Sequence, residues 1–298
     1  MDRRKFLKSS ILLIATSLVR INKLLSGSAL TEELVMVKNG APEQMVKKAL
    51  EMLGSMRKFI NRGDVVFIKP NISWDRSPEY AANTHPEVVR TVVEECLNAG
   101  AKKVIVADRT CQETKRCYIN SGIQEAASKA GADVMYVRDY HFTTVRIPDG
   151  IDLKEWEFFK PALEADKYIN LPILKHHGLP GITVGLKNTM GIIGGNRGII
   201  HRNFDQKIVD INKVIKPTLT IVDATRILKA HGPQGGRLED VENANIILAG
   251  TDRVLIEAWS AQIFGINPAN LGFIKNAYEQ GLGRMDINKY KPAVYSFS

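Results

Sequence analysis

Cysteine is scarce in this chain, which has only Cys96, Cys111 and Cys117 among its 298 residues. Three thiols cannot provide the four ligands of a common iron–sulfur cluster, and their spacing is unlike that of zinc sites. No cysteine precedes Cys96, so an N-terminal lipoprotein anchor is excluded. Cys111 and Cys117 flank a polar loop. They either form a disulfide in an oxidising compartment or stay free as packing thiols, and the sequence leaves both alternatives open.

Stripes of Lys and Arg interleaved with aromatic residues are also absent. The formal net charge is +9, from 41 basic and 32 acidic side chains. Six of the basic side chains and one of the acidic ones lie within the first 29 residues, so the rest of the chain is close to balance. We therefore expect no nucleic-acid partner.

Several common catalytic and nucleotide-binding motifs are missing. The segment Gly185-Leu186-Lys187-Asn188 lacks the glycine directly before lysine and the hydroxyl after it that a phosphate-binding loop needs. No strand leads directly into the glycines at 191–195, which excludes the dinucleotide fingerprint. No serine nucleophile elbow, sequence repeat or low-complexity tract is present.

A long apolar run is lacking too, and this argues against a membrane span at the N-terminus. The run Ile11–Val19 is shorter than the roughly 20 residues of a membrane span. It follows a charged start with the pair Arg3-Arg4, and Gly27-Ser28-Ala29 supplies small residues for cleavage, as in an export signal. Residues 1–29 closely resemble a twin-arginine signal. The resemblance implies export by the twin-arginine translocase, a periplasmic or extracytoplasmic location, and no stable membrane span after cleavage.

The rest of the chain alternates between strand-like and helix-like segments. This alternation predicts βαβ units and an α/β fold with mainly parallel sheets. We expect two Rossmann-like lobes, 30–155 and 156–298, with a hinge between Pro148 and Pro161 and a ligand cleft between them. Strands are predicted at 64–68, 103–107, 133–137, 168–173, 218–222 and 245–248, and helices at 43–62, 87–98, 119–130, 205–215, 252–264 and 273–280.

The segment 175–203 combines glycines, imidazoles and cations. Its seven glycines weaken ordinary packing, and this suggests that the backbone approaches a ligand closely. Three of the six histidines of the chain lie here, and neutral imidazole can bind a metal or transfer protons. The other notable side chains of the segment are cationic: Lys175, Lys187, Arg197 and Arg202.

Polar residues follow several of the predicted strands. Ligands of open α/β sheets bind beyond the carboxyl ends of the strands, a rule that selects Lys69, Asn71, Asp108, Lys175 and Asp223. Each has a simpler alternative, since the two aspartates could cap turns and Lys69 could be a solvated edge cation. The same holds for one histidine. His85 precedes a proline and a helix start, so it is either a cap neighbour or a general acid or base.

Much of the chain after residue 29 resembles the domain of unknown function 362 family. The similar stretches are VVFIKPN, THPEVVRTVVEECLNAGAKKVIVAD, INLPILKHHGLPGITVGLKNTMGII, VDA followed by GPQGG, and ILAGTD ending in EQGLG. Members are often linked to iron–sulfur ferredoxin segments, which this chain lacks, so the resemblance implies a separate redox partner protein for any electron transfer. Glu257 stands where members usually carry aspartate.

The same region is more distantly similar to nickel-pincer lactate racemases. Glycines Gly181 and Gly185 follow His177 at the fourth and eighth positions, and Lys187 follows at the tenth, as in that family. The resemblance implies that Lys187 tethers a cofactor and that His201 binds a metal. Thr84-His85-Pro86 is similar to the segment that holds the family's other catalytic histidine. The resemblance therefore implies that His85 and His177 transfer protons.

The residues and both resemblances together predict an exported, cofactor- or metal-dependent enzyme that acts on a small anionic organic molecule. Its chemistry would be acid–base catalysis of an isomerase or oxidoreductase type. The alternatives are a non-catalytic periplasmic binding or electron-transfer partner and a purely structural protein. The cofactor would be nickel, iron or an organic group tethered to lysine. The expected catalytic residues are His85, His177 and Lys187; the expected cofactor-binding residues are Lys69, Asn71, Asp108, Lys175, Gly181, Gly185, Lys187, Arg197 and Asp223; the expected metal ligands are His176 and His201.

Overall fold

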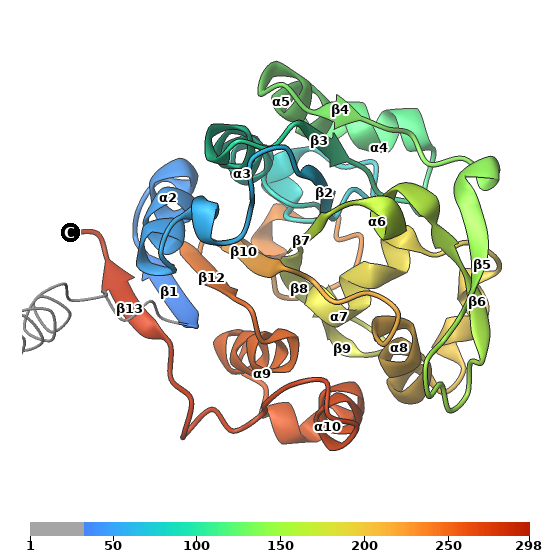
Figure 1. The fold of residues 1–298 in the computed structure, drawn as a ribbon. Coiled ribbons are helices and arrows are strands. Elements are labelled where there is room, and N and C mark those ends of the chain that lie inside the picture. Colours follow the sequence, from blue (N-terminus) through green and yellow to red (C-terminus); the bar gives the residue numbers. More distant parts are fainter. Residues whose placement is uncertain (1–32) are drawn as a thin grey trace, which may run out of the picture. The chain divides into compact units, whose positions relative to one another are not determined.

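One large sheet forms the centre of the computed structural model, which describes residues 33–298 (Figure 1). The run β10-β7-β2-β3-β4 is parallel, whereas β12 lies antiparallel between β10 and β1. β8 and β11 pair with β10, and β9 pairs with β8. In spatial order the strands are β13 (Ala293–Ser296), β1 (Leu34–Lys38), β12 (Ile246–Gly250), β10 (Leu219–Leu228), β7 (Lys167–Leu171), β2 (Val65–Pro70), β3 (Lys103–Val106) and β4 (Asp133–Val134), with β8 (Ile173–His177), β9 (Gly181–Thr183) and β11 (Val241–Glu242) attached.

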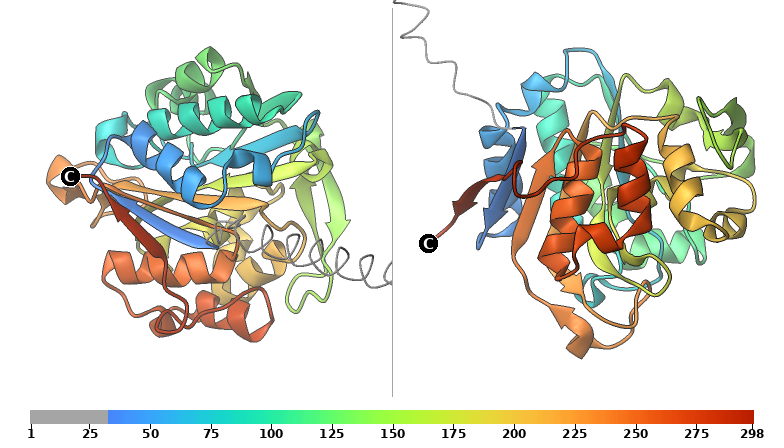
Figure 2. Two further views of the ribbon diagram at one scale, coloured as in Figure 1. Left: turned by 60° about the vertical axis from the view of Figure 1, so that its left-hand side comes forward. Right: turned by 90° about the horizontal axis from the view of Figure 1, so that it is seen from below.

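Helices cover both faces of this sheet (Figure 2). α2 (Pro42–Met52), α3 (Pro86–Ala99), α4 (Thr114–Asn120) and α5 (Ile123–Lys129) share one hydrophobic core, and α8 (Phe204–Asn212), α9 (Arg253–Phe264) and α10 (Gly272–Glu279) share the other. Alternate strand residues divide between the cores, as the pleat requires. Val66 and Ile68 face the first core, and Phe67 faces the second.

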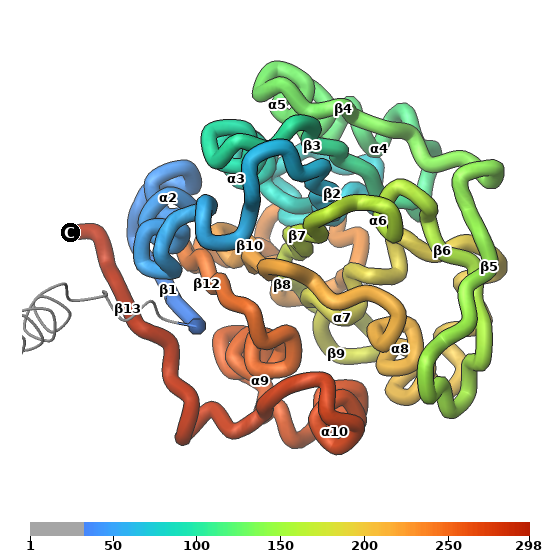
Figure 3. The backbone as a smooth tube through the Cα atoms, in the orientation of Figure 1, coloured from blue at the N-terminus to red at the C-terminus, as the bar shows by residue number. Residues whose placement is uncertain are grey.

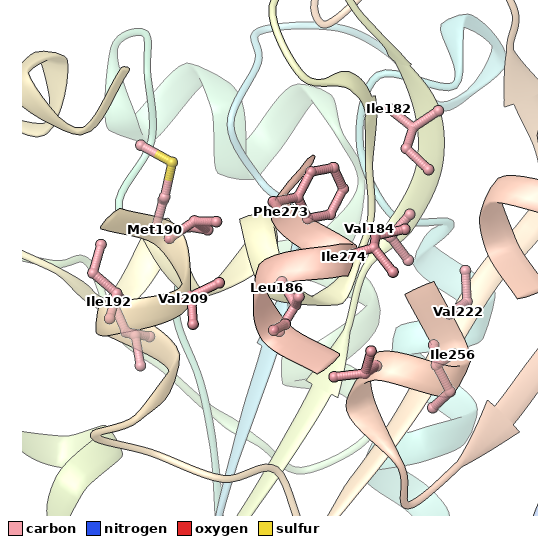
Figure 4. Close-up of a cluster of buried hydrophobic side chains, with 14 of the residues drawn as sticks. Ile182, Val184, Leu186, Met190, Ile192, Val209, Val222, Ile256, Phe273 and Ile274 are labelled. Atoms are coloured by element: carbon pink, nitrogen blue, oxygen red, sulfur yellow. The ribbon is translucent and has the colours of Figure 1, made fainter. Parts of the chain in front are cut away.

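The second core holds the glycine-rich segment in place. Leu186 of α7 (Gly185–Asn188) and Met190 pack there with Phe273 and Ile274 of α10 (Figure 4). Each apolar side chain of this size contributes about 1.5–3 kcal/mol when fully buried. Segment 182–193 is therefore a packed part of the interior despite its glycines.

The predicted α/β class with a mainly parallel sheet is confirmed. The strands of 30–155 and 156–298 nevertheless build the same sheet, because β7 pairs with β2. Residues 33–298 fall in one compact unit, so the boundary at 155/156 does not divide them into separately packed lobes. The expected hinge region, Pro148 to Pro161, contains β6 (Glu155–Phe159) and the start of α6 (Lys160–Glu164). β6 forms a hairpin with β5 (Phe142–Arg146), which precedes the region.

Several predicted elements have other bounds. The helix expected at 43–62 ends at Met52, and that expected at 119–130 is interrupted at Gly122, whose φ is +72°. The strand expected at 168–173 is divided at Pro172, and β10 continues past Asp223 to Leu228. Short 3-10 turns occupy Met56–Lys58, Pro78–Tyr80, Asp139–His141, Thr189–Ile192, Arg197–His201, Leu238–Asp240 and Pro268–Asn270.

The two ends of the described chain meet at one edge of the sheet. β13 pairs in parallel with β1, and Figure 3 shows the C-terminal strand running alongside it. Within residues 33–298 no helix combines the length and the apolar character of a membrane span. The predicted twin-arginine signal, residues 1–29, lies outside the described residues.

Candidate functional site

A cavity of about 380 Å³ lies where β2, β8 and the glycine-rich segment meet. No carboxylate among the described residues lines it, although four cationic side chains do. Seven of the predicted site residues contribute to its wall: Lys69, Asn71, Lys175, His177, Lys187, Arg197 and His201. The remaining wall comes from Ser73, Trp74, Cys111, Thr183, Asn188, Met190, Gly191, Gly198 and Pro233.

Lys69 lies at the end of β2 and is a buried, paired cation. Its Nζ lies 2.9 Å from Asp108 Oδ1 and 2.7 Å from Asn188 Oδ1. Burial lowers the pKa of Lys69, and the Asp108 carboxylate opposes that effect. Asp108 also accepts a hydrogen bond from the backbone N–H of Ile72 at 2.6 Å. Asp108 therefore acts from behind the cavity wall as the counter-ion of Lys69.

Asparagine amides connect this ion pair to the rest of the wall. Asn188 Nδ2 donates to Asn170 Oδ1 at 2.8 Å and to the Lys69 carbonyl at 3.0 Å. Asn71 Nδ2 donates to Asn188 Oδ1 at 3.4 Å. Asn170 Nδ2 donates to the Gly185 carbonyl at 2.9 Å. These bonds join β2, β7 and α7, so the wall is fixed before any ligand arrives.

Lys175 lies on β8 and is only 1% exposed. Its Nζ donates to Asn71 Oδ1 at 3.3 Å and to the Ala82 carbonyl. Burial, reinforced by the charge of Lys187, lowers the pKa of Lys175 to about 7. An amine with this pKa is partly neutral at neutral pH, which makes it a competent base or nucleophile.

Lys187 is held by the short helix α7. Its Nζ makes no hydrogen bond or ion pair with any other residue of 33–298, and it lines the cavity. Burial is the main cause that lowers the pKa of Lys187 to about 8. Glu257 of α9 anchors the helix, because Glu257 Oε1 accepts a hydrogen bond from the Leu186 N–H at 2.5 Å.

The imidazoles of His177 and His201 lie with their ring centroids 6.2 Å apart. His177 is on the same face of β8 as Lys175, two residues away. Burial, followed by the charges of Lys187 and Lys175, lowers the pKa of His177 to about 2, and burial also lowers the pKa of His201. Both rings are therefore neutral at neutral pH and can exchange hydrogen bonds with a ligand.

Arg197 connects the glycine-rich segment to the loop after β3. Its guanidinium donates to the carbonyls of Arg109 at 2.7 Å and Thr110 at 2.6 Å, and it lies 3.9 Å from Cys111 Sγ. The backbone bonds fix its position, and no carboxylate of residues 33–298 forms an ion pair with it. Arg197 thus adds to the positive potential of the cavity.

Other predicted site residues do not line the cavity. His85 is the N-cap of α3, where its Nδ1 accepts from the Glu87 N–H, and its own N–H donates to Asp223 Oδ2 at 2.7 Å. Asp223 lies inside β10 and also accepts from Thr225. The structure thus supports the capping alternative for His85. His176 points away from its neighbour His177, because adjacent strand residues face opposite sides, and accepts from the Gly232 N–H.

The two predicted glycine contacts have structural explanations. Gly181 begins β9 with φ of +80°, in the turn after β8, and an added Cβ would lie 3.3 Å from Leu271. Gly185 begins α7, where a Cβ would lie 3.1 Å from both Asn170 and Glu257. Neither lines the cavity. Their small size serves the packing of the segment.

Within the described part of the chain no three His, Cys, Asp or Glu side chains gather closely enough to hold a metal. Of the two predicted metal ligands, His201 lines the cavity and His176 does not. The described side chains alone therefore do not fit a bound nickel or iron ion. The Lys187 amine, the predicted tether of an organic cofactor, lines the cavity. Cys111 and Cys117 are free thiols, and the alternative disulfide is not formed.

Three residues of the site were not predicted from the sequence. Asn188 makes hydrogen bonds to Lys69 and Asn170 and so lies at the centre of the amide network of the wall. Gly191 lines the wall, and Glu257 anchors α7. A Cβ at Gly191 would lie 1.8 Å from Asp108 Oδ1, so glycine is required for this close approach. In the sequence, only its position beside Lys187 suggests a role for Asn188. The structure shows that the Asn188 side chain bonds to Lys69 of β2.

Comparison with known proteins gives the following matches. A family model described as "Domain of unknown function (DUF362)" matches residues 66–262, more than half of the chain. The thylakoid-associated protein sll1697 of Synechocystis sp. is 26% identical over 234 residues, which cover 76% of this chain and 71% of that protein.

Two solved structures are also similar. The lactate racemase apoprotein from Thermoanaerobacterium thermosaccharolyticum matches 74% of this chain with 14% identity and a TM-score of 0.42. A protein from Thermotoga maritima matches 61% of this chain with 14% identity and a TM-score of 0.38. This chain spans 54% and 51% of these two chains, about half the length of each.

Proposed function

The chain belongs to the DUF362 family, and we propose that its cavity binds a small anionic organic molecule on which the protein acts by acid–base chemistry. The observation that carries the proposal is the charge of the wall. Lys69, Lys175, Lys187 and Arg197 line one cavity of about 380 Å³, and no carboxylate among the described residues lines it. A concave surface with one sign of charge concentrates ligands of the opposite sign.

The cations have different roles in this proposal. Lys69 is neutralised by Asp108, so it contributes structure rather than ligand binding. Lys187 has an amine without a hydrogen bond to the described residues, and Arg197 has no carboxylate partner there. These two side chains would hold the carboxylate or phosphate of the ligand, because a charge-assisted hydrogen bond is stronger than a neutral one.

The lysines are better suited to proton transfer than the histidines. A general acid or base works best with a pKa near the working pH, and the pKa values of Lys175 and Lys187 are lowered to about 7 and about 8. Since the pKa of His177 is lowered to about 2, its ring would act as a neutral hydrogen-bonding group. The predicted proton transfer by imidazoles thus moves to the amines in our proposal.

Ligand binding is tested by titration calorimetry with small mono- and dicarboxylates and with inorganic phosphate. We expect the Lys187→Met variant to lose at least about tenfold in affinity, because one charge-assisted bond contributes about 1.5–3 kcal/mol. Lys102→Met is the matched control, since Lys102 is exposed at the other end of β3 from Asp108. Equal losses in both variants, or no binding by the native protein, would refute the proposed site.

Binding without turnover would favour the alternative of a binding protein. Turnover is measured by exchange of substrate C–H protons for deuterium in heavy water, which reports proton abstraction without any assumption about the product. Intact mass of the protein from its native host shows whether Lys187 carries a tethered organic group. An unmodified chain that binds anions and exchanges no protons would leave the binding protein as the function.

Export by the twin-arginine route is part of the same proposal. It rests on the sequence of residues 1–29, and its test is independent of the cavity. The mature protein, isolated from the fraction outside the cytoplasm, should begin after Ala29. Replacement of Arg3 and Arg4 by lysine should retain the precursor in the cytoplasm, and unchanged export of that variant would contradict the route.

A further inference from the structure

Lys175 is a buried amine without a counter-ion. It is 1% exposed, and no carboxylate of residues 33–298 forms an ion pair with it. Lys69 in the same cavity is also 1% exposed, but Asp108 lies 2.9 Å from its Nζ. Burial of an ammonium ion without a partner is very costly. The two lysines are therefore in different chemical states although they lie in the same wall.

The hydrogen bonds of Lys175 match those of a neutral amine. Its Nζ has two acceptors, Asn71 Oδ1 and the Ala82 carbonyl. A neutral amine has two N–H groups and one lone pair, whereas an ammonium ion has three N–H groups and no lone pair. The two acceptors use both N–H groups of the amine. They leave its lone pair unused, and a third N–H of an ammonium would have no acceptor in the described chain.

The orientation of the Asn71 amide supports this assignment. Asn71 Nδ2 donates to Asn188 Oδ1, which also accepts from the Lys69 ammonium. Asn71 must therefore turn its Oδ1 toward Lys175 as an acceptor. The charged Lys69 thus fixes, through the amides of Asn188 and Asn71, the acceptor to which Lys175 donates. The lone pair of Lys175 is the part of its amine that remains for a ligand in the cavity that Lys175 lines.

We propose that Lys175 is a nucleophile that forms an imine with a small aldehyde or ketone bearing a carboxylate. This inference deepens the proposed function, on which it rests, by naming the class of ligand. The Nζ lone pair forms a bond to the carbonyl carbon, and the C–O π bond breaks. The two amine protons then move to the carbonyl oxygen, the remaining C–O bond breaks to release water, and the nitrogen forms the C=N π bond, so the products are the imine and one water molecule.

The surrounding residues suit the two ends of such a ligand. Lys187 and Arg197 carry the positive charge for its carboxylate. His177 lies on the same face of β8 as Lys175, and its Nδ1 accepts a backbone N–H at 3.2 Å. The Nε2–H of the neutral ring can therefore donate a hydrogen bond to the carbonyl oxygen. Asn71, which already accepts a bond from Lys175, keeps the amine in position during the attack.

Reductive trapping on the native mature protein tests the proposal. The protein is incubated with glyoxylate and sodium cyanoborohydride, digested and mapped by mass spectrometry. We expect a carboxymethyl group on Lys175 at a rate well above that at the exposed Lys102, and the excess should disappear when a non-carbonyl carboxylate such as oxalate fills the cavity. Adducts only on Lys187 or on surface lysines, or no adduct at all, would overturn the proposal.

Two variants separate loss of chemistry from loss of structure. Lys175→Met keeps the length of the side chain without an amine, and Lys175→Arg keeps N–H donors on a long side chain but forms no imine under these conditions. Both should lose the trapped adduct. Circular dichroism verifies the fold, and oxalate calorimetry of the native protein reports anion binding. If oxalate binds but Lys175 is not trapped, imine formation fails and the proposed function stands. If oxalate does not bind, the proposed function itself fails.

Discussion

At the scale of single residues, the cavity depends on one buried ion pair. Lys69 and Asp108 are both at most 1% exposed and lie 2.9 Å apart. Removing one partner of a buried pair leaves an uncompensated charge, which costs about 3–5 kcal/mol. We expect Asp108→Asn to lower the free energy of unfolding by this amount in urea titrations at neutral pH.

The matched control for this prediction is an exposed pair at the first residues of β3 and β4, the opposite strand ends from Asp108. Lys103 and Asp133 lie 2.8 Å apart with 48% and 47% of their side chains exposed. Because solvent screens such pairs, Asp133→Asn should change stability by at most about 1 kcal/mol. Equal effects of the two substitutions would show that Asp108 is not the buried counter-ion of Lys69.

Glu257 predicts a pH dependence of stability. Burial raises the pKa of its carboxyl group to about 8, whereas the unfolded chain has a pKa of about 4.3. Between these values the unfolded state releases a proton that the folded state retains, so this group's contribution to stability is complete below about pH 4.3 and is lost as the pH rises to about 8. Glu257→Gln removes this loss but keeps an acceptor for the Leu186 N–H.

The variant should therefore resemble the native protein at pH 5 and become the more stable of the two by a few kcal/mol at pH 8. Urea unfolding at several pH values in this range measures the difference. A difference that stays constant with pH would mean that Glu257 is ionised in the folded protein.

At the scale of elements, the glycine-rich segment contains glycines of opposite kinds. A Cβ at Gly191 would lie 1.8 Å from Asp108 Oδ1 and 2.3 Å from Lys69 Cε, whereas a Cβ at Gly178 would meet no atom within 4 Å. Gly191→Ala should destabilise the fold by at least about 1–3 kcal/mol through overpacking. It should also weaken anion binding, because displacement of the Lys69–Asp108 pair distorts the cavity wall.

Gly178→Ala is the control within the same segment, and it should change stability by no more than about 0.5 kcal/mol. Thermal unfolding and calorimetry of both variants distinguish a close contact from a general need for flexible backbone. If both substitutions weaken binding equally, flexibility rather than the contact at Gly191 explains the glycines.

The sequence predicted those parts of the fold and site that depend on local patterns. Apolar runs located β2 and β3, and the strand-end rule selected Lys69 and Lys175, because a parallel strand brings its last residues to the ligand-binding edge. His85 does not line the cavity, because the same Thr-His-Pro pattern also suits an N-cap, the position it occupies on α3. Asn188 and Glu257 were missed because their roles depend on contacts across 119 and 71 residues of sequence.

At the scale of the whole molecule, strands from both predicted lobes build one sheet. The alternation of predicted strands and helices restarts near residue 155, so the sequence predicts two α/β units. Only strand pairing reveals that β7, from the second half, enters the sheet between β2 and β10. Both halves of the sequence therefore contribute to the cavity wall: Lys69 comes from the first half, and Lys175 and Lys187 come from the second.

This topology predicts that the first half cannot fold alone. In a fragment of residues 33–155, β2 would lose its pairing with β7, and β1 would lose its antiparallel partner β12. The apolar face that packs against α8, α9 and α10 would be exposed to water, and burial of such surface contributes about 25 cal/mol per Å². We expect no cooperative thermal transition for this fragment by circular dichroism, and a single transition for residues 33–298. A fragment that unfolds cooperatively would restore the two-lobe architecture, with the cation-lined cavity as an interface between independent units.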